Sequence, residues 1–144
     1  MNTEKIIEYL KAVDLFKNLE NNLLEQIAGK MKFEKFGKKE IVFREGEQGN
    51  KMYILIDGKI VLSQNDCGKD IVISVMVPVN TVGVMAILDG EPRSLSLRSV
   101  SDDTKMLSLS KEDFKKIVLL HTEMAFEIMK TLSIHLRDAN KRGK

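Results

Sequence analysis

The spacing of apolar residues divides the chain into three regions with different hydrophobic periods. In residues 6–31 apolar side chains recur every three or four positions, which is typical of amphipathic helices. One such face holds Leu24, Ile27, Ala28 and Met31. Asn21 stands where a capping residue is expected for that helix. We therefore predict that the N-terminal region is helical.

From about residue 33 to residue 109 the period shortens to that of β-strands, and glycines interrupt it. Short aliphatic or β-branched runs predict strands at residues 41–43, 52–56, 60–62, 71–77, 95–100 and 106–109. Turn residues separate these runs, and Asp57-Gly58 between two of them predicts a hairpin. Short strands at this spacing favour an antiparallel barrel or sandwich.

The helical period returns at Ser110, which forms a predicted capping box with Asp113. Farther on, apolar residues follow the spacing of a short coiled-coil seam. They are Ala125, Ile128, Met129, Leu132, Leu136 and Ala139. Two interpretations of this seam remain open: it is a dimer surface, or the helix packs on its own barrel.

Composition narrows the class of protein. The chain has 144 residues, of which 43% are hydrophobic and 31% charged, enough for one domain with a buried core. The net charge of +2 indicates neither nucleic-acid nor membrane binding. The single cysteine, Cys67, excludes an intrachain disulfide and suits a reducing compartment. No apolar run has the length of a membrane span. We expect a soluble, single-domain, cytoplasmic protein that binds neither membranes nor nucleic acid directly.

Residues suited to catalysis are sparse. His121 and His135 have no cysteine or carboxylate at metal-ligand spacing, so we interpret them as solvated or cap-neighbouring histidines. Cys67 lies in a polar turn with no histidine placed to activate it, which predicts a surface thiol. We find no pair of nucleophile and base. The sequence therefore predicts a protein that is not an enzyme and has no metal or cofactor.

Residues 82–97 have the composition of a small-anion site. Gly83 precedes a short run of helix formers, and Arg93 opens the next strand. The first N–H groups of a helix lack internal partners, and a glycine lets an anion approach the backbone. Arginine binds phosphate oxygens bidentately. Two interpretations remain open: a phosphate site, or a capped helix with Arg93 paired to a surface carboxylate.

The chain also resembles the cyclic nucleotide-binding domains of catabolite-activator-type regulators, kinase regulatory subunits and gated channels, from about residue 15 to residue 140. Residues 41–47 and 52–60 resemble the family's signature β-hairpins, residues 83–96 its phosphate-binding cassette, and the helix from about Thr122 its lid and dimerisation helix. The resemblance implies a mainly β fold, an antiparallel double-stranded β-helix (jelly-roll) barrel with flanking helices. We expect N-terminal helices in 1–31, the barrel in 32–109 and C-terminal helices in 110–144.

The resemblance also implies a set of ligand-binding residues. Arg93 matches the arginine that pairs with the cyclic phosphate, and Gly83 matches the cassette glycine. The full set is Gly83, Val84, Met85, Ala86, Arg93, Ser94 and Leu95. Val84 departs from the family, whose glutamate at this position accepts a hydrogen bond from the ribose 2′-OH. A lost hydrogen bond of this charged kind costs roughly 1.5–3 kcal/mol.

Two functions follow from the resemblance. The first is a non-enzymatic regulatory domain that senses cAMP, cGMP or a related phosphate ligand and relays binding by movement of the C-terminal helix. Such a domain would form a homodimer through helix 122–140 and act on an unknown protein partner. The alternative is a degenerate barrel that binds no nucleotide and serves as an interaction or dimerisation domain. No DNA-binding domain is expected, because the sequence ends at Lys144.

Overall fold

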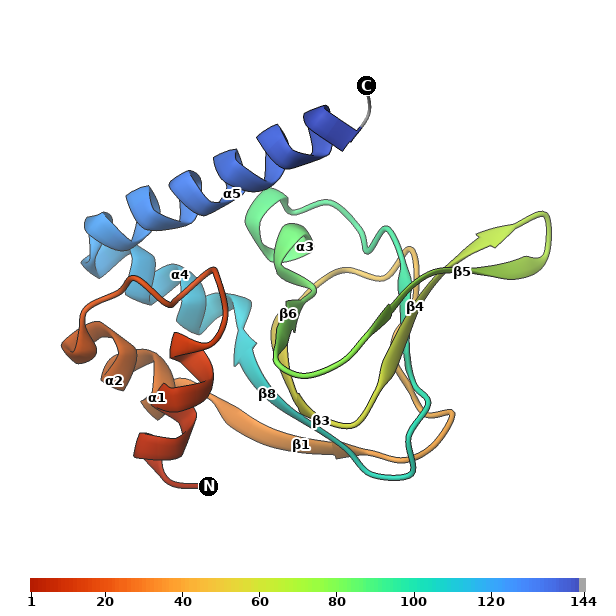
Figure 1. Ribbon diagram of the computed structural model, residues 1–144, viewed down its shortest axis with the longest axis horizontal. Helices are drawn as coiled ribbons and strands as arrows, with labels where there is room; N and C mark the ends of the chain where they lie inside the picture. Colours follow the sequence, from red (N-terminus) through yellow and green to blue (C-terminus); the bar gives the residue numbers. More distant parts are fainter. Residues whose placement is uncertain (143–144) are drawn as a thin grey trace.

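The computed structural model describes residues 1–142 and shows a β-barrel flanked by helices (Figure 1). The helices are α1 (Thr3–Lys11), α2 (Asn21–Lys30), α3 (Val84–Asp89), α4 (Lys111–Leu120) and α5 (Thr122–Arg142). The strands are β1 (Lys32–Phe36), β2 (Ile41–Phe43), β3 (Lys51–Asp57), β4 (Ile60–Asp66), β5 (Lys69–Met76), β6 (Asn80–Val82), β7 (Ser96–Ser99) and β8 (Thr104–Ser110). Residues 143 and 144 of the predicted C-terminal region lie outside the described residues.

The strands form two four-stranded antiparallel sheets. One sheet has the order β1-β8-β3-β6 and the other the order β2-β7-β4-β5. Among residues 1–142, β4 and β5 are the only strands that are consecutive in the chain and paired with each other, and the other pairs join strands distant in sequence. This is the connectivity of a jelly roll. The predicted mainly β jelly-roll barrel with flanking helices is confirmed.

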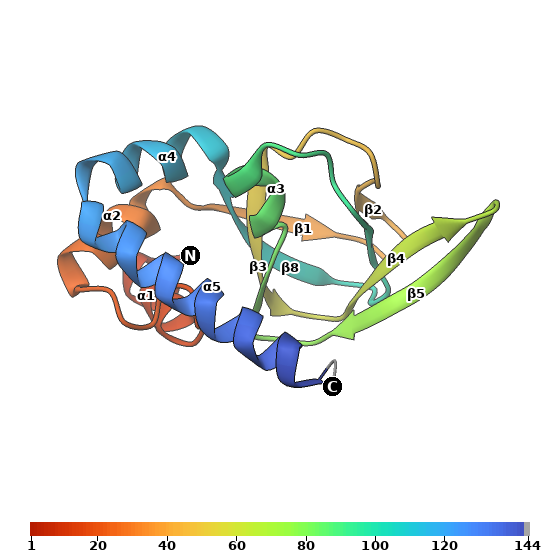
Figure 2. The same cartoon turned by 90° about the horizontal axis from the view of Figure 1, so that it is seen from above.

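Strand β3 explains why the barrel and the helices share one structure. Its side chains alternate between two faces, as in any strand. Met52, Ile54 and Ile56 belong to a core formed with the helices, whereas Tyr53 and Leu55 belong to a second core inside the barrel. Both faces of the strand are therefore buried. The helices α1, α2, α4 and the start of α5 gather at one end of the barrel, and the β4–β5 hairpin projects from the other (Figure 2).

The predicted helix caps have mixed outcomes. Ser110 caps α4, and its hydroxyl accepts a hydrogen bond from the Asp113 backbone N–H at 3.1 Å, which confirms Ser110 as the predicted cap. The cap predicted at Asn21 is wrong. Asn21 is the first residue within α2, and the cap position belongs to Glu20, whose side chain makes no capping hydrogen bond.

The hairpin predicted at Asp57-Gly58 is also wrong. Gly58 does adopt a positive φ of 97°. However, β3 pairs with β6 and β8, while β4 pairs with β5 and β7 in the other sheet. Both edges of β3 are already occupied, so the chain crosses between sheets at this turn. The hairpin in this region joins β4 to β5 through Cys67 and Gly68, both at positive φ, and Cys67 is exposed as predicted.

The apolar seam of helix α5 is partly buried and partly exposed. Ile128 is buried in the core that α5 shares with the other helices. Met129 and Leu136 are exposed, as is Phe126. The helix therefore packs on its own domain with one face and presents apolar side chains on another. Within residues 1–142, no helix combines the length and apolar character needed to cross a membrane.

Candidate functional site

The cassette, residues 82–97, connects the two sheets: it runs from the end of β6 through α3 to β7. Gly83 caps the start of α3 with φ 79°, and Gly90 caps its end with φ 73° and donates its N–H to the Ala86 carbonyl. These left-handed conformations are favourable for glycine and strained for other residues. The two glycines therefore set the short length of α3.

Arg93 is the central residue of the cassette, and it is only 6% exposed. Its Nη1 donates to the carbonyl oxygen of Gly83 at 2.8 Å, and its Nη2 donates to that of Lys51 at 2.6 Å. Its Cζ lies 4.0 Å from the centre of the Phe43 ring. Within residues 1–142, the partners of the guanidinium are main-chain carbonyls and an aromatic ring rather than a surface carboxylate. The ion-pair interpretation of Arg93 is therefore wrong.

The backbone of Arg93 is held as firmly as its side chain. Its N–H donates to the Glu47 carbonyl at 2.7 Å, and its own carbonyl accepts from the Gly46 N–H at 2.8 Å. The connection between β2 and β3 thus pairs with the cassette on both sides of this residue. Because main chain and side chain are both anchored, the position of the guanidinium is determined by three separate segments of the chain.

Two glycines leave the space that Arg93 occupies. A Cβ at Gly49 would lie 2.5 Å from the Ala86 Cβ and 3.2 Å from the Arg93 Cζ. A Cβ at Gly83 would lie 2.6 Å from the Arg93 Nη1. Real Cβ atoms do not approach neighbours this closely. Glycine at these two positions is therefore required by the close packing around the guanidinium.

Burial affects the protonation of the groups around Arg93. It lowers the pKa of the Arg93 guanidinium, while the nearby Tyr53 and Glu47 act in the opposite direction. An arginine remains charged in proteins even with a lowered pKa. Burial also raises the pKa of the Tyr53 phenol, assisted by the Glu34 carboxylate, so this residue is neutral at pH 7. The site therefore carries one buried positive charge.

The other predicted ligand residues are spread over different environments. Ala86 is buried beside Gly49, and Val84 is half-buried and packs against the core shared with the helices. Met85 is 66% exposed, Ser94 is exposed and Leu95 is half-buried. Sequence reasoning did not single out Phe43, Gly49 or Lys51, which contact or make room for Arg93. The glycines of the turn at residues 46–49 were the available sequence signal that the backbone there lies close to another part of the chain.

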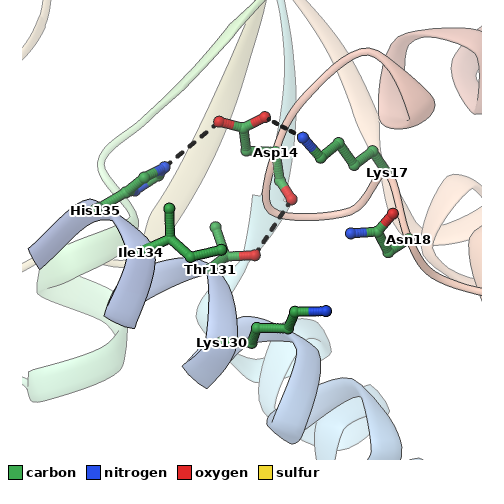
Figure 3. Close-up of a pocket in the computed structure, with 7 residues that line it drawn as sticks. All are labelled: Asp14, Lys17, Asn18, Lys130, Thr131, Ile134 and His135. Atoms are coloured by element: carbon green, nitrogen blue, oxygen red, sulfur yellow. Dashed lines mark hydrogen bonds and ion pairs between the residues drawn. The ribbon is translucent and has the colours of Figure 1, made fainter. Parts of the chain in front are cut away.

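A second charged cluster, the junction cluster of Asp14, Lys17 and His135, lies where the α1–α2 connection meets α5 (Figure 3). The Asp14 carboxylate accepts from Lys17 Nζ at 2.9 Å and lies 3.4 Å from His135 Nε2. The Thr131 hydroxyl donates to the Asp14 carbonyl at 3.4 Å. A hollow of about 230 Å³ opens beside these residues. The side chains of all three residues are at least half exposed, so the cluster is solvated.

Both histidines have the environments predicted for them. His121 is the C-cap residue of α4, and its Nε2 lies 3.0 Å from the Gln26 Oε1. His135 is exposed in the junction cluster. Among residues 1–142, no group of three or more His, Cys, Asp or Glu side chains is arranged to hold a metal ion.

The sequence matches the cyclic nucleotide-binding domain family over residues 33–121, more than half of the chain. This chain belongs to the cyclic nucleotide-binding domain family. The matched residues include the barrel from β2 to β8, the cassette and α4. The family assignment predicted from the sequence is confirmed.

Individual relatives agree with this assignment. The anaerobic regulatory protein of Bacillus subtilis is 30% identical over 125 residues, which are 86% of this chain and 51% of that protein. The regulatory domain of Toxoplasma gondii PKA, solved with cAMP, is 26% identical with a TM-score of 0.76, over 80% of this chain and 44% of that one. The N-terminal domain of a Streptomyces coelicolor transcriptional regulator shares the fold, with 21% identity and a TM-score of 0.82, over 94% of this chain and 95% of that one. The chain thus spans about half the length of the Bacillus protein.

Proposed function

We propose that this chain is a non-enzymatic regulatory domain that binds a small phosphate-bearing ligand at the cassette. The observation that carries the proposal is the buried, anchored guanidinium of Arg93. A guanidinium has five N–H donors, and two of them hold the carbonyls of Gly83 and Lys51. The remaining donors suit phosphate oxygens, and the desolvated position limits screening by salt. The similarity to a Toxoplasma domain solved with cAMP supports cyclic nucleotides as the first ligands to test.

The proposal includes a relay to the C-terminal helix, which the core shared by α3 and α5 supports. Ile87 of α3 is buried in the same cluster as Met124 and Ile128 of α5. A ligand that shifts α3 changes the packing available to α5, because a close-packed core does not deform continuously. The ligand shifts the equilibrium between two positions of α5 only to the extent that it binds the protein with different affinity in the two positions.

A homodimer through helix 122–140 is part of this proposal. Phe126, Met129 and Leu136 are exposed on α5, an apolar face that a second copy would bury. The proposal also includes a protein partner downstream and a cytoplasmic location, which the single exposed Cys67 suits.

The alternative function is a barrel that binds no nucleotide and acts by interaction or dimerisation. Two observations favour it. The hydrocarbon side chain of Val84, which packs against the helical core, has no acceptor for a ribose hydroxyl. The Arg93 guanidinium is already bonded to two carbonyls. In this function Arg93 would be a structural residue that ties the cassette to β3.

Titration calorimetry with cAMP and with cGMP distinguishes the two functions. The purified chain is first checked for co-purified nucleotide, and the Arg93→Ala variant is compared with Arg98→Ala, which removes a half-buried arginine from β7. Saturable binding that Arg93→Ala abolishes and Arg98→Ala retains supports the sensor. Absence of heat from both ligands at millimolar concentration, with a folded protein, favours the interaction domain.

Introducing a carboxylate at residue 84 tests whether the cassette contacts the ribose of the ligand. Val84→Glu is expected to strengthen cAMP binding by roughly tenfold or more, the equivalent of one charged hydrogen bond. The 2′-deoxy analogue of cAMP is the control, because it lacks the hydroxyl that Glu would accept from. Equal gains for both nucleotides would show that the added carboxylate acts without contacting the ribose.

A further inference from the structure

Phe43 covers one face of the Arg93 guanidinium. The ring belongs to the last residue of β2, and its centre lies 4.0 Å from the Arg93 Cζ. At this distance a cation is attracted to the negative face of an aromatic ring. Phe43 also contacts Tyr53, with ring centres 6.3 Å apart, and Tyr53 meets Phe36 edge-on at 6.4 Å. The guanidinium therefore lies at the end of a chain of three aromatic rings.

Backbone atoms contact further parts of the guanidinium. Its Nη1 and Nη2 hold the carbonyls of Gly83 and Lys51, and the Gly49 backbone approaches so closely that a Cβ there would lie 3.3 Å from Arg93 Nε. An arginine side chain has many rotamers, and fixing it costs conformational entropy. In this site the side chain is already fixed when the protein folds. A ligand therefore binds donor groups that are already in position, without a further loss of side-chain entropy.

We propose that Phe43 is a positioning residue for Arg93. Its ring fixes the orientation of the guanidinium plane. In that orientation two N–H groups donate to the two carbonyls, and the remaining N–H groups are left to donate to an incoming anion. The carbonyls alone fix two nitrogen atoms, and the ring resists rotation of the group out of the plane that they define. This role rests on the proposed ligand binding at the cassette, but the position of the guanidinium can be measured without ligand.

Three variants separate positioning from simple packing. Phe43→Leu keeps a large apolar side chain and removes the aromatic face, whereas Phe43→Tyr keeps that face. Phe36→Leu is the matched control, because Phe36 is half-buried in the same aromatic chain and contacts Tyr53 rather than Arg93. Thermal unfolding of each variant identifies any that fail to fold, and the conservative Phe43→Tyr variant then provides the comparison with wild type.

The first readout is the Arg93 Nε–H resonance in the ligand-free protein, identified by its loss in Arg93→Lys. Solvent exchange of this proton is expected to accelerate at least threefold in Phe43→Leu and to stay near the wild-type rate in Phe43→Tyr and Phe36→Leu. Equal exchange rates in Phe43→Leu and Phe36→Leu would overturn the positioning role.

The second readout is the affinity for cAMP, with inorganic phosphate as the simpler anion. A cation–π contact of this kind corresponds to about a three- to thirtyfold change in affinity. We expect Phe43→Leu to lose affinity in that range while Phe43→Tyr and Phe36→Leu retain it. The wild type and all variants could fail to bind either anion while Nε–H exchange accelerates in Phe43→Leu alone. In that case the proposed ligand function fails and the positioning of Arg93 by Phe43 stands. If the wild type binds either anion, unchanged affinity in a folded Phe43→Leu overturns the positioning role.

Discussion

The cassette and the junction cluster both contain charged side chains, but they hold them in opposite ways. Arg93 is buried, and its partners are two main-chain carbonyls and an aromatic ring. Asp14, Lys17 and His135 are at least half exposed and interact through their side chains. A buried charge depends on every partner, because each lost hydrogen bond leaves a desolvated polar group. Exposed ion pairs are replaced by water and contribute little.

The two regions also connect different segments of the chain. The cassette ties β3, the β2–β3 connection and α3 together through one residue. The junction cluster ties the α1–α2 connection to α5 by contacts that water can replace (Figure 3). The first region is therefore built to hold a fixed geometry. The charged contacts of the second contribute little to that geometry, because water can replace them.

The largest effect is expected from Arg93→Ala. The substitution leaves the carbonyls of Gly83 and Lys51 without their donor, so the free energy of unfolding should fall by about 2–4 kcal/mol. Urea denaturation of the ligand-free protein measures this change. Arg98→Ala, the arginine control on β7, is expected to change it by no more than about 1 kcal/mol. Similar losses in both variants would show that the buried guanidinium has no special structural role.

A smaller effect is expected from adding a methyl group beside Arg93. The Cβ of Gly49→Ala would lie 2.5 Å from the Ala86 Cβ, and overpacking of this kind costs about 1–3 kcal/mol. The matched control is Gly29→Ala in α2, where a Cβ meets nothing within 4 Å. Because alanine favours helices over glycine, this control should stabilise the protein by up to about 1 kcal/mol. Shifts of the unfolding midpoint in the same direction for both variants, relative to wild type, would contradict the packing observed around the guanidinium.

The smallest effect is expected at the junction cluster, as a pH dependence. Hydrogen bonds from Lys17 and then His135 lower the pKa of Asp14 below its usual value of 3.8. A carboxyl group with a lowered pKa in the folded state stabilises the protein above its unfolded-state pKa and loses that contribution as the pH falls through the folded-state pKa. The contribution should be below about 1 kcal/mol because the pair is exposed.

Urea denaturation of wild type and Asp14→Asn at pH 6 and at pH 2.5 measures this contribution. The stability difference between the two proteins is expected at pH 6 and should largely vanish at pH 2.5. It should also shrink in 1 M salt, which screens exposed charges. A difference that persists undiminished at pH 2.5 would assign the stabilising role to packing of residue 14 rather than to its charge.

Local patterns in the sequence were sufficient for much of the fold. The hydroxyl of Ser110 and the backbone of Asp113 are three residues apart, so their contact follows from helix geometry alone. Prediction failed where strand pairing decided the outcome. Gly58 turns the chain as expected, yet the turn leads to the other sheet because β6 and β8 occupy both edges of β3. Strand β1 was not predicted, since Phe33 and Phe36 are three residues apart and do not show the alternation of a strand.

The local structure of residues 83–93 was predictable because these residues are contiguous. Gly83 and Arg93 are ten residues apart, and the composition between them indicated a short helix followed by a turn. The other partners of Arg93 come from β2, β3 and their connection, roughly forty to fifty residues earlier in the chain. Sequence alone offered no means to match Phe43 or the Lys51 carbonyl to this arginine.

The sequence by itself determined the family, the helical and strand periods, the glycines around α3 and the presence of an arginine in the cassette. These features depend on side-chain type and on neighbours within one turn or one strand. Only the tertiary structure decided that Arg93 is buried against Phe43, that Val84 packs toward the helices, and that α5 buries Ile128 while exposing Met129. Those outcomes depend on which distant segments meet, because burial and hydrogen bonding are properties of the assembled barrel rather than of any segment within it.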